Sequence, residues 1–118
     1  MTVRRMKTYT GGQGYVYQYY FVGKRPAIAT GPPATEYIFD VTSDRKSTYS
    51  VNVLVETSAL EAWAASHGRA ATEAEQYGAA KLRLFKAFDE IEDMKAAGRV
   101  VRVDAAELED AFATLGVE

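Results

Sequence analysis

The apolar residues of this chain change their period once, near Ser58, and this change constrains the fold more than any other feature. Before it, three segments are rich in β-branched and aromatic residues, as is typical of strands: 14–23, 34–42 and 47–56. After it, apolar residues recur at spacings of three and four, which is the pattern of one helix face.

Three helices are predicted in the second half, and each begins at a capping residue that is followed three positions later by Glu. A short β-type segment, 99–103, separates the last two helices. Glycines stand where these helices are expected to stop. The helices run from Ser58 to Gly68, from Thr72 to about Ala96, before Gly98, and from Asp104 to Gly116.

The resulting order, β-β-β-α-α-β-α, predicts an α+β fold in two layers, a mainly antiparallel sheet with helices packed on one face. The 118 residues suit one domain, 1–118, in which 1–10 form a flexible or edge extension. The segment 14–23 is apolar on both faces, which indicates an inner strand. A slip of one residue would turn a whole apolar set to solvent. We therefore predict the cross-strand pairs Tyr37–Val53, Phe39–Val51 and Val41–Tyr49.

The chain has no cysteine and a single histidine, His67. This composition excludes disulfides, thiolate catalysis and zinc sites built on cysteine. We predict no metal and no cofactor, and we expect His67 to pack on Trp63 in the last turn of its helix. No signal-peptide pattern and no apolar run long enough to cross a bilayer is found, so a soluble, cytoplasmic protein without a membrane partner is expected.

Charge is divided unevenly along the chain. Residues 1–53 hold seven basic and three acidic side chains, whereas residues 54–118 hold seven and thirteen, so that charges of +4 and −6 give the net −2. Such asymmetry indicates a partner surface, or else only the solvated faces of acidic helices.

Five of the eight tyrosines lie between residues 9 and 20, beside the glycines of GGQG. This glycine run precedes a strand, whereas phosphate-binding glycine loops open a helix, so it predicts a turn. No basic residue stands among the tyrosines and the sequence pI is about 5.5, so we do not expect nucleic-acid binding. These aromatic side chains are candidates for the core or for a partner interface: Tyr15, Tyr17 and Tyr19 on one face, and Tyr20 on the other.

Lys81 stands within the apolar stripe of the long predicted helix, one turn after Tyr77. Its methylene stem could cover apolar surface while the ammonium reaches water. It could also be a buried amine paired with Asp40 or Glu36, or a lysine of lowered pKa that acts as a base or nucleophile. A pocket between the sheet and this helix would use Tyr77, Lys81 and Asp40 with the sheet tyrosines.

If the first two predicted strands pair antiparallel, the GGQG turn and the tip SDRKS lie at one end of the sheet. Backbone amides beside Arg45 and Lys46 are then candidates to bind an acidic ligand or partner.

No catalytic constellation is found. We expect a non-catalytic domain that binds a partner protein, another copy of itself, or a larger assembly as an accessory subunit. The alternative is a small-molecule- or anion-binding protein, or a minor enzyme.

Overall fold

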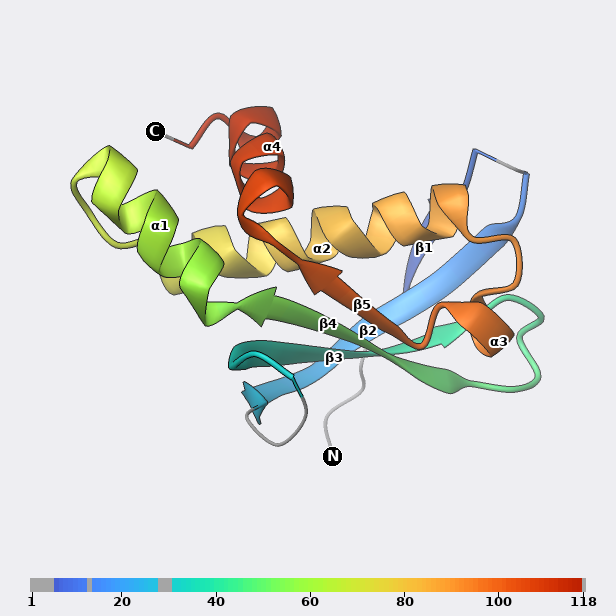
Figure 1. The fold of residues 1–118 in the computed structure, drawn as a ribbon. Helices are drawn as coiled ribbons and strands as arrows, with labels where there is room; N and C mark the ends of the chain where they lie inside the picture. The colour runs from blue at the N-terminus through green and yellow to red at the C-terminus, as the bar shows by residue number, and fades with distance from the viewer. Residues whose placement is uncertain (1–5, 13, 28–30, 118) are drawn as a thin grey trace.

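The computed structural model describes residues 6–12, 14–27 and 31–117. It confirms an α+β fold (Figure 1). The elements in chain order are β1 (Lys7–Thr10), β2 (Val16–Ala27), β3 (Ala34–Thr42), β4 (Tyr49–Glu56), α1 (Thr57–His67), α2 (Glu73–Glu90), α3 (Met94–Ala97), β5 (Val100–Val103) and α4 (Ala105–Leu115).

The five strands form one curled sheet in the order β1-β2-β3-β4-β5, antiparallel except for the β4–β5 pair. The predicted register between β3 and β4 is confirmed, including the pair Phe39–Val51. The predicted order lacked two short elements. One is β1, which pairs with the start of β2 as an edge strand, and the other is α3.

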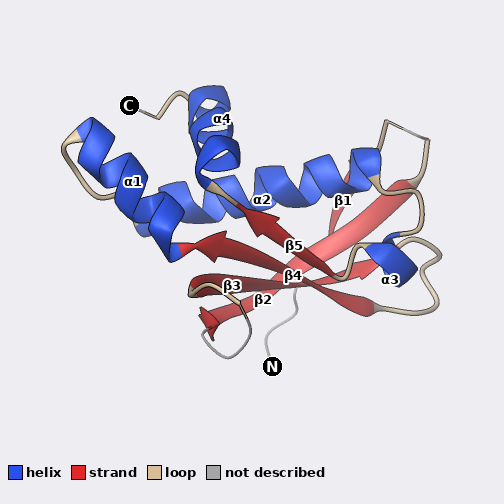
Figure 2. Cartoon of the chain, in the orientation of Figure 1, coloured by secondary structure: helices blue, strands red, loops and turns tan. Residues whose placement is uncertain are grey.

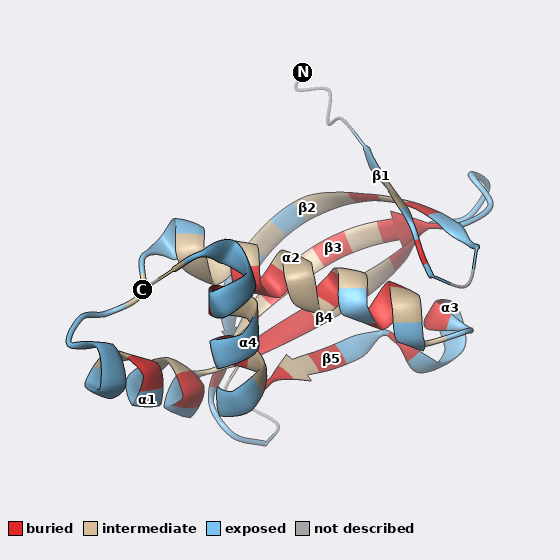
Figure 3. Ribbon diagram, turned by 90° about the horizontal axis from the view of Figure 1, so that it is seen from above, coloured by how far each residue is buried: buried red, intermediate tan, exposed pale blue. Residues whose placement is uncertain are grey.

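The core lies between one face of the sheet and the helices α1, α2 and α4, which gather on that side in Figure 2. Burial alternates along much of β3 and β4 (Figure 3), since successive residues of a strand face opposite sides of the sheet. Phe39, Val51, Leu84 and Phe88 are fully buried at this contact. The other sheet face carries paired polar side chains, such as Tyr20–Asp40 and Asn52–Glu36, together with the apolar side chains of Ile38, Leu54 and Val100.

The long helix ends earlier than the sequence predicted. α2 stops at Glu90, because Ile91 takes an extended conformation with φ −100° and ψ 114°. Asp93 then caps α3 by accepting a hydrogen bond from the Ala96 amide at 3.2 Å. This break turns Met94 inward, where it is 2% exposed. The expected continuation of this helix to about Ala96 is therefore wrong.

The capping boxes predicted at Thr72 and Asp104 are both present. The one predicted at Ser58 is not, because α1 follows β4 without a loop and begins at Thr57. The Thr57 amide donates instead to the Pro33 carbonyl at 3.0 Å, so a neighbouring segment supplies what a capping side chain would. α1 and α4 end at Gly68 and Gly116, as predicted, and both glycines take the left-handed conformation.

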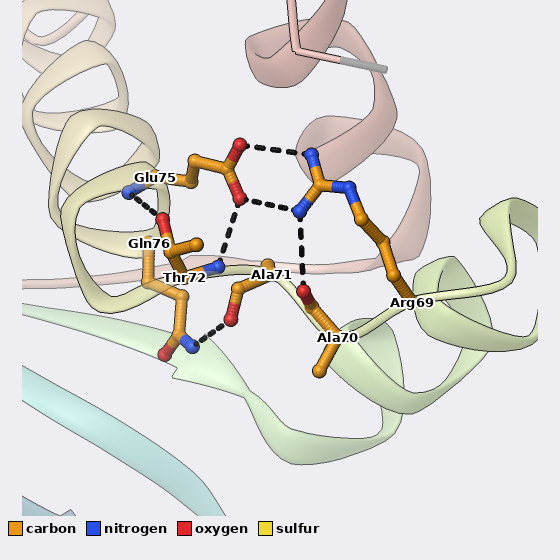
Figure 4. A network of polar contacts seen from close by, with 6 residues as sticks. All are labelled: Arg69, Ala70, Ala71, Thr72, Glu75 and Gln76. Carbon is orange, nitrogen blue, oxygen red and sulfur yellow. Dashed lines mark hydrogen bonds and ion pairs between the residues drawn. The ribbon is translucent and has the colours of Figure 1, made fainter.

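Arg69 joins the α1–α2 connection to the first turn of α2 (Figure 4). Its two terminal nitrogens donate to the two carboxylate oxygens of Glu75, each at 2.9 Å, in a bidentate pair. The same carboxylate accepts from the Thr72 amide at 2.8 Å. The Arg69 hydrogen bonds, and next the Thr72 amide, lower the pKa of Glu75 to about 2. The network therefore persists well below the pH at which a glutamate ordinarily protonates.

β2 extends beyond the predicted 14–23 and includes Pro26. A bulge between Phe21 and Gly23 shifts the register there, which places Lys24 opposite Tyr37. β1 pairs with β2 only as far as Tyr19, so the later part of β2 is an edge. A proline is tolerated at an edge, since its missing N–H would have had no strand to pair with.

Candidate functional site

The four candidate tyrosines in and before β2 do not lie together on one exposed face. Tyr17 and Tyr19 belong to the core, at 2% and 4% exposed, whereas Tyr15 precedes the strand and is 46% exposed. Tyr20 lies on the opposite face and donates to Asp40 at 2.7 Å. Tyr17 and Tyr19 are buried against α2, with their ring centres 4.2 and 6.3 Å from that of Phe88.

Lys81 does not meet either carboxylate suggested for it. Asp40 and Glu36 lie on the sheet face away from the helices, where Asp40 is held by Tyr20 and Glu36 by Arg25 and Asn52. The Lys81 ammonium instead lies 5.8 Å from the ring centres of Tyr77 and Phe85. Burial lowers its pKa, and the neighbouring Lys7 lowers it further. This geometry matches a lysine that covers aromatic surface with its stem.

The pocket expected between the sheet and α2 is filled. Tyr77 occupies that space, with its ring centre 5.0 Å from Phe21, 6.3 Å from Phe39 and 6.4 Å from Tyr37. Tyr77 and Lys81 thus lie together, but they line no cavity with Asp40.

Replacing Lys81 by methionine is expected to change the free energy of unfolding by no more than about 1 kcal/mol. Methionine keeps an apolar stem on Tyr77 and Phe85 and removes the repulsion from Lys7, at the loss of two weak cation–π contacts. Urea unfolding followed by circular dichroism measures the difference. A loss of about 3 kcal/mol or more would instead indicate a buried ion pair broken by the change.

The β1–β2 turn and the β3–β4 tip do lie at the same end of the sheet, as expected. The amides of the tip are already occupied, however. The Asp44 carboxylate accepts from the amides of Lys46, at 2.8 Å, and Ser47, at 3.0 Å, and these bonds lower its pKa to about 2. The Arg45 amide donates to the Thr42 hydroxyl at 3.1 Å. The Asp44 carboxylate therefore already occupies these amides. The amides beside Arg45 and Lys46 do not offer the expected anion site.

A cavity of about 320 Å³ lies instead along the outer side of α2, where α4 crosses it; we call it the α2–α4 groove. A Cβ atom at Gly78 would lie 3.0 Å from the end of the Leu115 side chain, so this glycine leaves room for that side chain of α4. Apolar side chains supply half of the lining: Tyr9, Ala79, Leu82, Phe85, Val103 and Ala111. Polar side chains supply the rest: Arg83, Lys86, Asp89, Glu107, Asp110 and Thr114.

Arg83 lines the groove and has two partners through its Nε. Its Nε donates to the Arg102 carbonyl at 2.9 Å and lies 3.0 Å from a Glu107 carboxylate oxygen. Its Nη1 is buried and has no hydrogen-bond partner among the described residues. Buried donors are nearly always paired, because an unmade hydrogen bond costs about 1–3 kcal/mol. Arg83 is thus a cation of the groove lining with one unused donor, and that donor nitrogen is itself buried.

The other end of the groove is closed by Tyr9 and Asp89. The Tyr9 hydroxyl lies 2.8 and 3.0 Å from the two carboxylate oxygens, and the Gly12 amide donates to one of them at 2.8 Å. Burial raises the pKa of Tyr9, and Asp89 raises it further, so the phenol stays protonated and donates. The Tyr9 ring stacks on Phe85 at 4.4 Å. A strand of four residues is thereby fixed to the end of α2.

Sequence reasoning missed this site. Ala79, Leu82, Arg83 and Lys86 recur at spacings of three and four, which is a second stripe on α2. The stripe that packs on the sheet is more apolar, so it dominated the helical pattern. The groove exists only because α4 lies across this second stripe of α2.

Comparison with protein-family models, curated proteins and solved structures returns no match to this chain. Within residues 6–12, 14–27 and 31–117, no helix is both long and apolar enough to cross a membrane. Over the same residues, no group of three or more histidine or acidic side chains is arranged to hold a metal ion.

Proposed function

We propose that this protein is a non-catalytic binding protein whose α2–α4 groove holds a small, largely apolar molecule that carries a carboxylate. The observation that carries the proposal is a cavity with apolar residues in half of its lining and a lining cation that has an unused donor. Ligand sites are typically cavities of about 300–1,000 Å³ with mostly apolar linings and a few placed polar groups. The groove, at about 320 Å³, is at the small end of this range.

The unused donor of Arg83, rather than the net charge of the lining, favours an anionic head group beside it, since the groove has three carboxylates and two cations. The unpaired Nη1 of Arg83 would gain an acceptor, and Lys86 lines the groove one turn further along α2. Two of the three acidic groups in the lining are engaged, since Glu107 lies against Arg83 and Asp89 accepts from Tyr9 and Gly12, whereas the Asp110 side chain has no partner among the described residues. The apolar body of the ligand would lie on Leu82 and Phe85.

Docking of a partner protein, including a second copy, has weaker support. On the sheet face away from the helices, polar side chains pair with one another, as in Tyr20–Asp40 and Arg102–Glu56. The large apolar side chains that are most exposed are spread over both edges of the sheet and the end of α4, and a stable interface usually needs one contiguous patch. They are Met6, Tyr15, Val16, Val22, Val100 and Leu115.

The test is a titration of the protein with octanoate, octylamine and 1-octanol, followed by amide chemical shifts. Octanoate is expected to bind at least about ten-fold more tightly than octylamine, a difference of about 1.4 kcal/mol. The shifts should cluster on α2 and α4. Equal binding of all three compounds, or no saturable binding of octanoate, would overturn the proposal.

A matched pair of variants places the site. Ala111→Phe fills the groove with a ring, so octanoate affinity should fall by about ten-fold or more. Ala113→Phe adds the same ring to an exposed position of α4 outside the lining, and it should bind as the wild type does. Unchanged binding by Ala111→Phe would place the ligand elsewhere.

A further inference from the structure

A second cavity, of about 420 Å³, lies at the end of the sheet where the β1–β2 turn, the β3–β4 tip and α3 meet. We call it the sheet-end cavity. Three tyrosines line it, Tyr15, Tyr17 and Tyr49, together with Glu92 and Asp93 from the break between α2 and α3. It shares no lining residue with the α2–α4 groove.

The phenols of this cavity have unused hydrogen-bonding groups. Tyr17 and Tyr49 are only 2% and 7% exposed, yet neither hydroxyl makes a hydrogen bond with another described residue. The Tyr17 ring is held in place by stacking on Phe88, with ring centres 4.2 Å apart. Burial is the main cause that raises the pKa of both phenols, that of Tyr49 to about 12, so they are neutral at ordinary pH.

The acidic side chains of the cavity are also without a cation partner. Neither Glu92 nor Asp93 forms an ion pair with a described residue, although Asp93 accepts from the Ala96 amide at 3.2 Å. Lys95 is the single cation of the lining, and Arg99 lies outside it, 5.6 Å from the Tyr49 ring. The lining therefore combines aromatic rings, phenol oxygens and two carboxylates, with a net negative charge.

We propose that the sheet-end cavity binds a small quaternary or tertiary ammonium ion. Aromatic rings attract such cations through their negative faces, most strongly where water is excluded, and carboxylates add a Coulomb attraction. Tyr15, at 46% exposed, is the most exposed of the three tyrosines and would offer its ring to a cation in the cavity. From the sequence, an acidic ligand was expected at this end of the sheet. The net negative charge of the cavity lining favours a cationic ligand instead.

The test compares choline with 3,3-dimethyl-1-butanol, its neutral analogue of nearly the same shape. Followed by amide chemical shifts, choline is expected to bind at the start of β2 and at α3, at least about ten-fold more tightly than the neutral analogue. Higher salt should weaken its binding. Equal binding of both compounds would show an apolar site and overturn the proposal, as would the absence of saturable choline binding.

Variants at the exposed mouth test the rings without disturbing the core. Tyr15→Ala should lower choline affinity by about ten-fold, whereas Tyr15→Phe, which keeps a ring face, should stay within about three-fold of the wild type. Tyr20→Phe, on the other face of β2, and Ala111→Phe, in the α2–α4 groove, should bind choline unchanged. Unchanged binding by Tyr15→Ala would overturn the proposal.

Discussion

Replacing Phe88 by alanine is expected to lower the free energy of unfolding by about 3–5 kcal/mol. Phe88 is fully buried and stacks on Tyr17, with the rings of Tyr9 and Tyr19 at 5.8 and 6.3 Å. The change removes the aromatic ring that joins α2 to both β1 and β2. Because small domains have about 5–15 kcal/mol of stability in total, urea unfolding should show a large shift of the midpoint.

Two comparisons separate this effect from a general sensitivity of α2. Phe88→Leu leaves a smaller cavity, so it should cost clearly less than Phe88→Ala. Phe85→Ala removes a half-buried ring that stacks on Tyr9, and its cost should also be smaller. If Phe88→Ala cost less than about 1 kcal/mol, the packing of α2 on the sheet described above would be wrong.

The fold could be predicted wherever residues alternate between an apolar and a polar environment. The register of β3 on β4 follows from the period of two, because a slip would expose Phe39 and Val51. β1 could not be found this way, since only Tyr9 among its four residues turns to the core. Ser58 looks like a cap by its spacing, but the direct junction of β4 and α1 places the helix start one residue earlier.

The candidate sites could be predicted only in part, because each depends on elements that meet from distant parts of the chain. Lys81 was found from the strongest stripe of α2, yet that stripe packs on the sheet and its space is filled by Tyr77. The shared end of the sheet was predicted from strand direction. The negative charge of the cavity there was not predicted, because Glu92 reaches the sheet-end cavity only where α2 breaks at Ile91.

Replacing Asp89 by alanine is expected to lower the free energy of unfolding by about 1.5–3 kcal/mol, the usual value of hydrogen bonds to a charged group. The change leaves the Tyr9 hydroxyl and the Gly12 amide without their acceptor. β1 has four residues and is paired on one side only, so these bonds contribute much of its attachment. Hydrogen exchange at the amides of Lys7–Thr10 should accelerate more than exchange in β3 and β4.

Three further variants identify the cause. Tyr9→Phe keeps the stacking on Phe85 and loses one donor to the carboxylate, so it should cost about 1 kcal/mol. Asp89→Asn retains an oxygen that accepts from Gly12 and should fall between Tyr9→Phe and Asp89→Ala. Asp110→Ala removes a groove carboxylate whose side chain has no partner among the described residues, so its effect should be within about 0.5 kcal/mol. An equal loss from Asp110→Ala and Asp89→Ala would contradict this account, because net charge would then explain the effect.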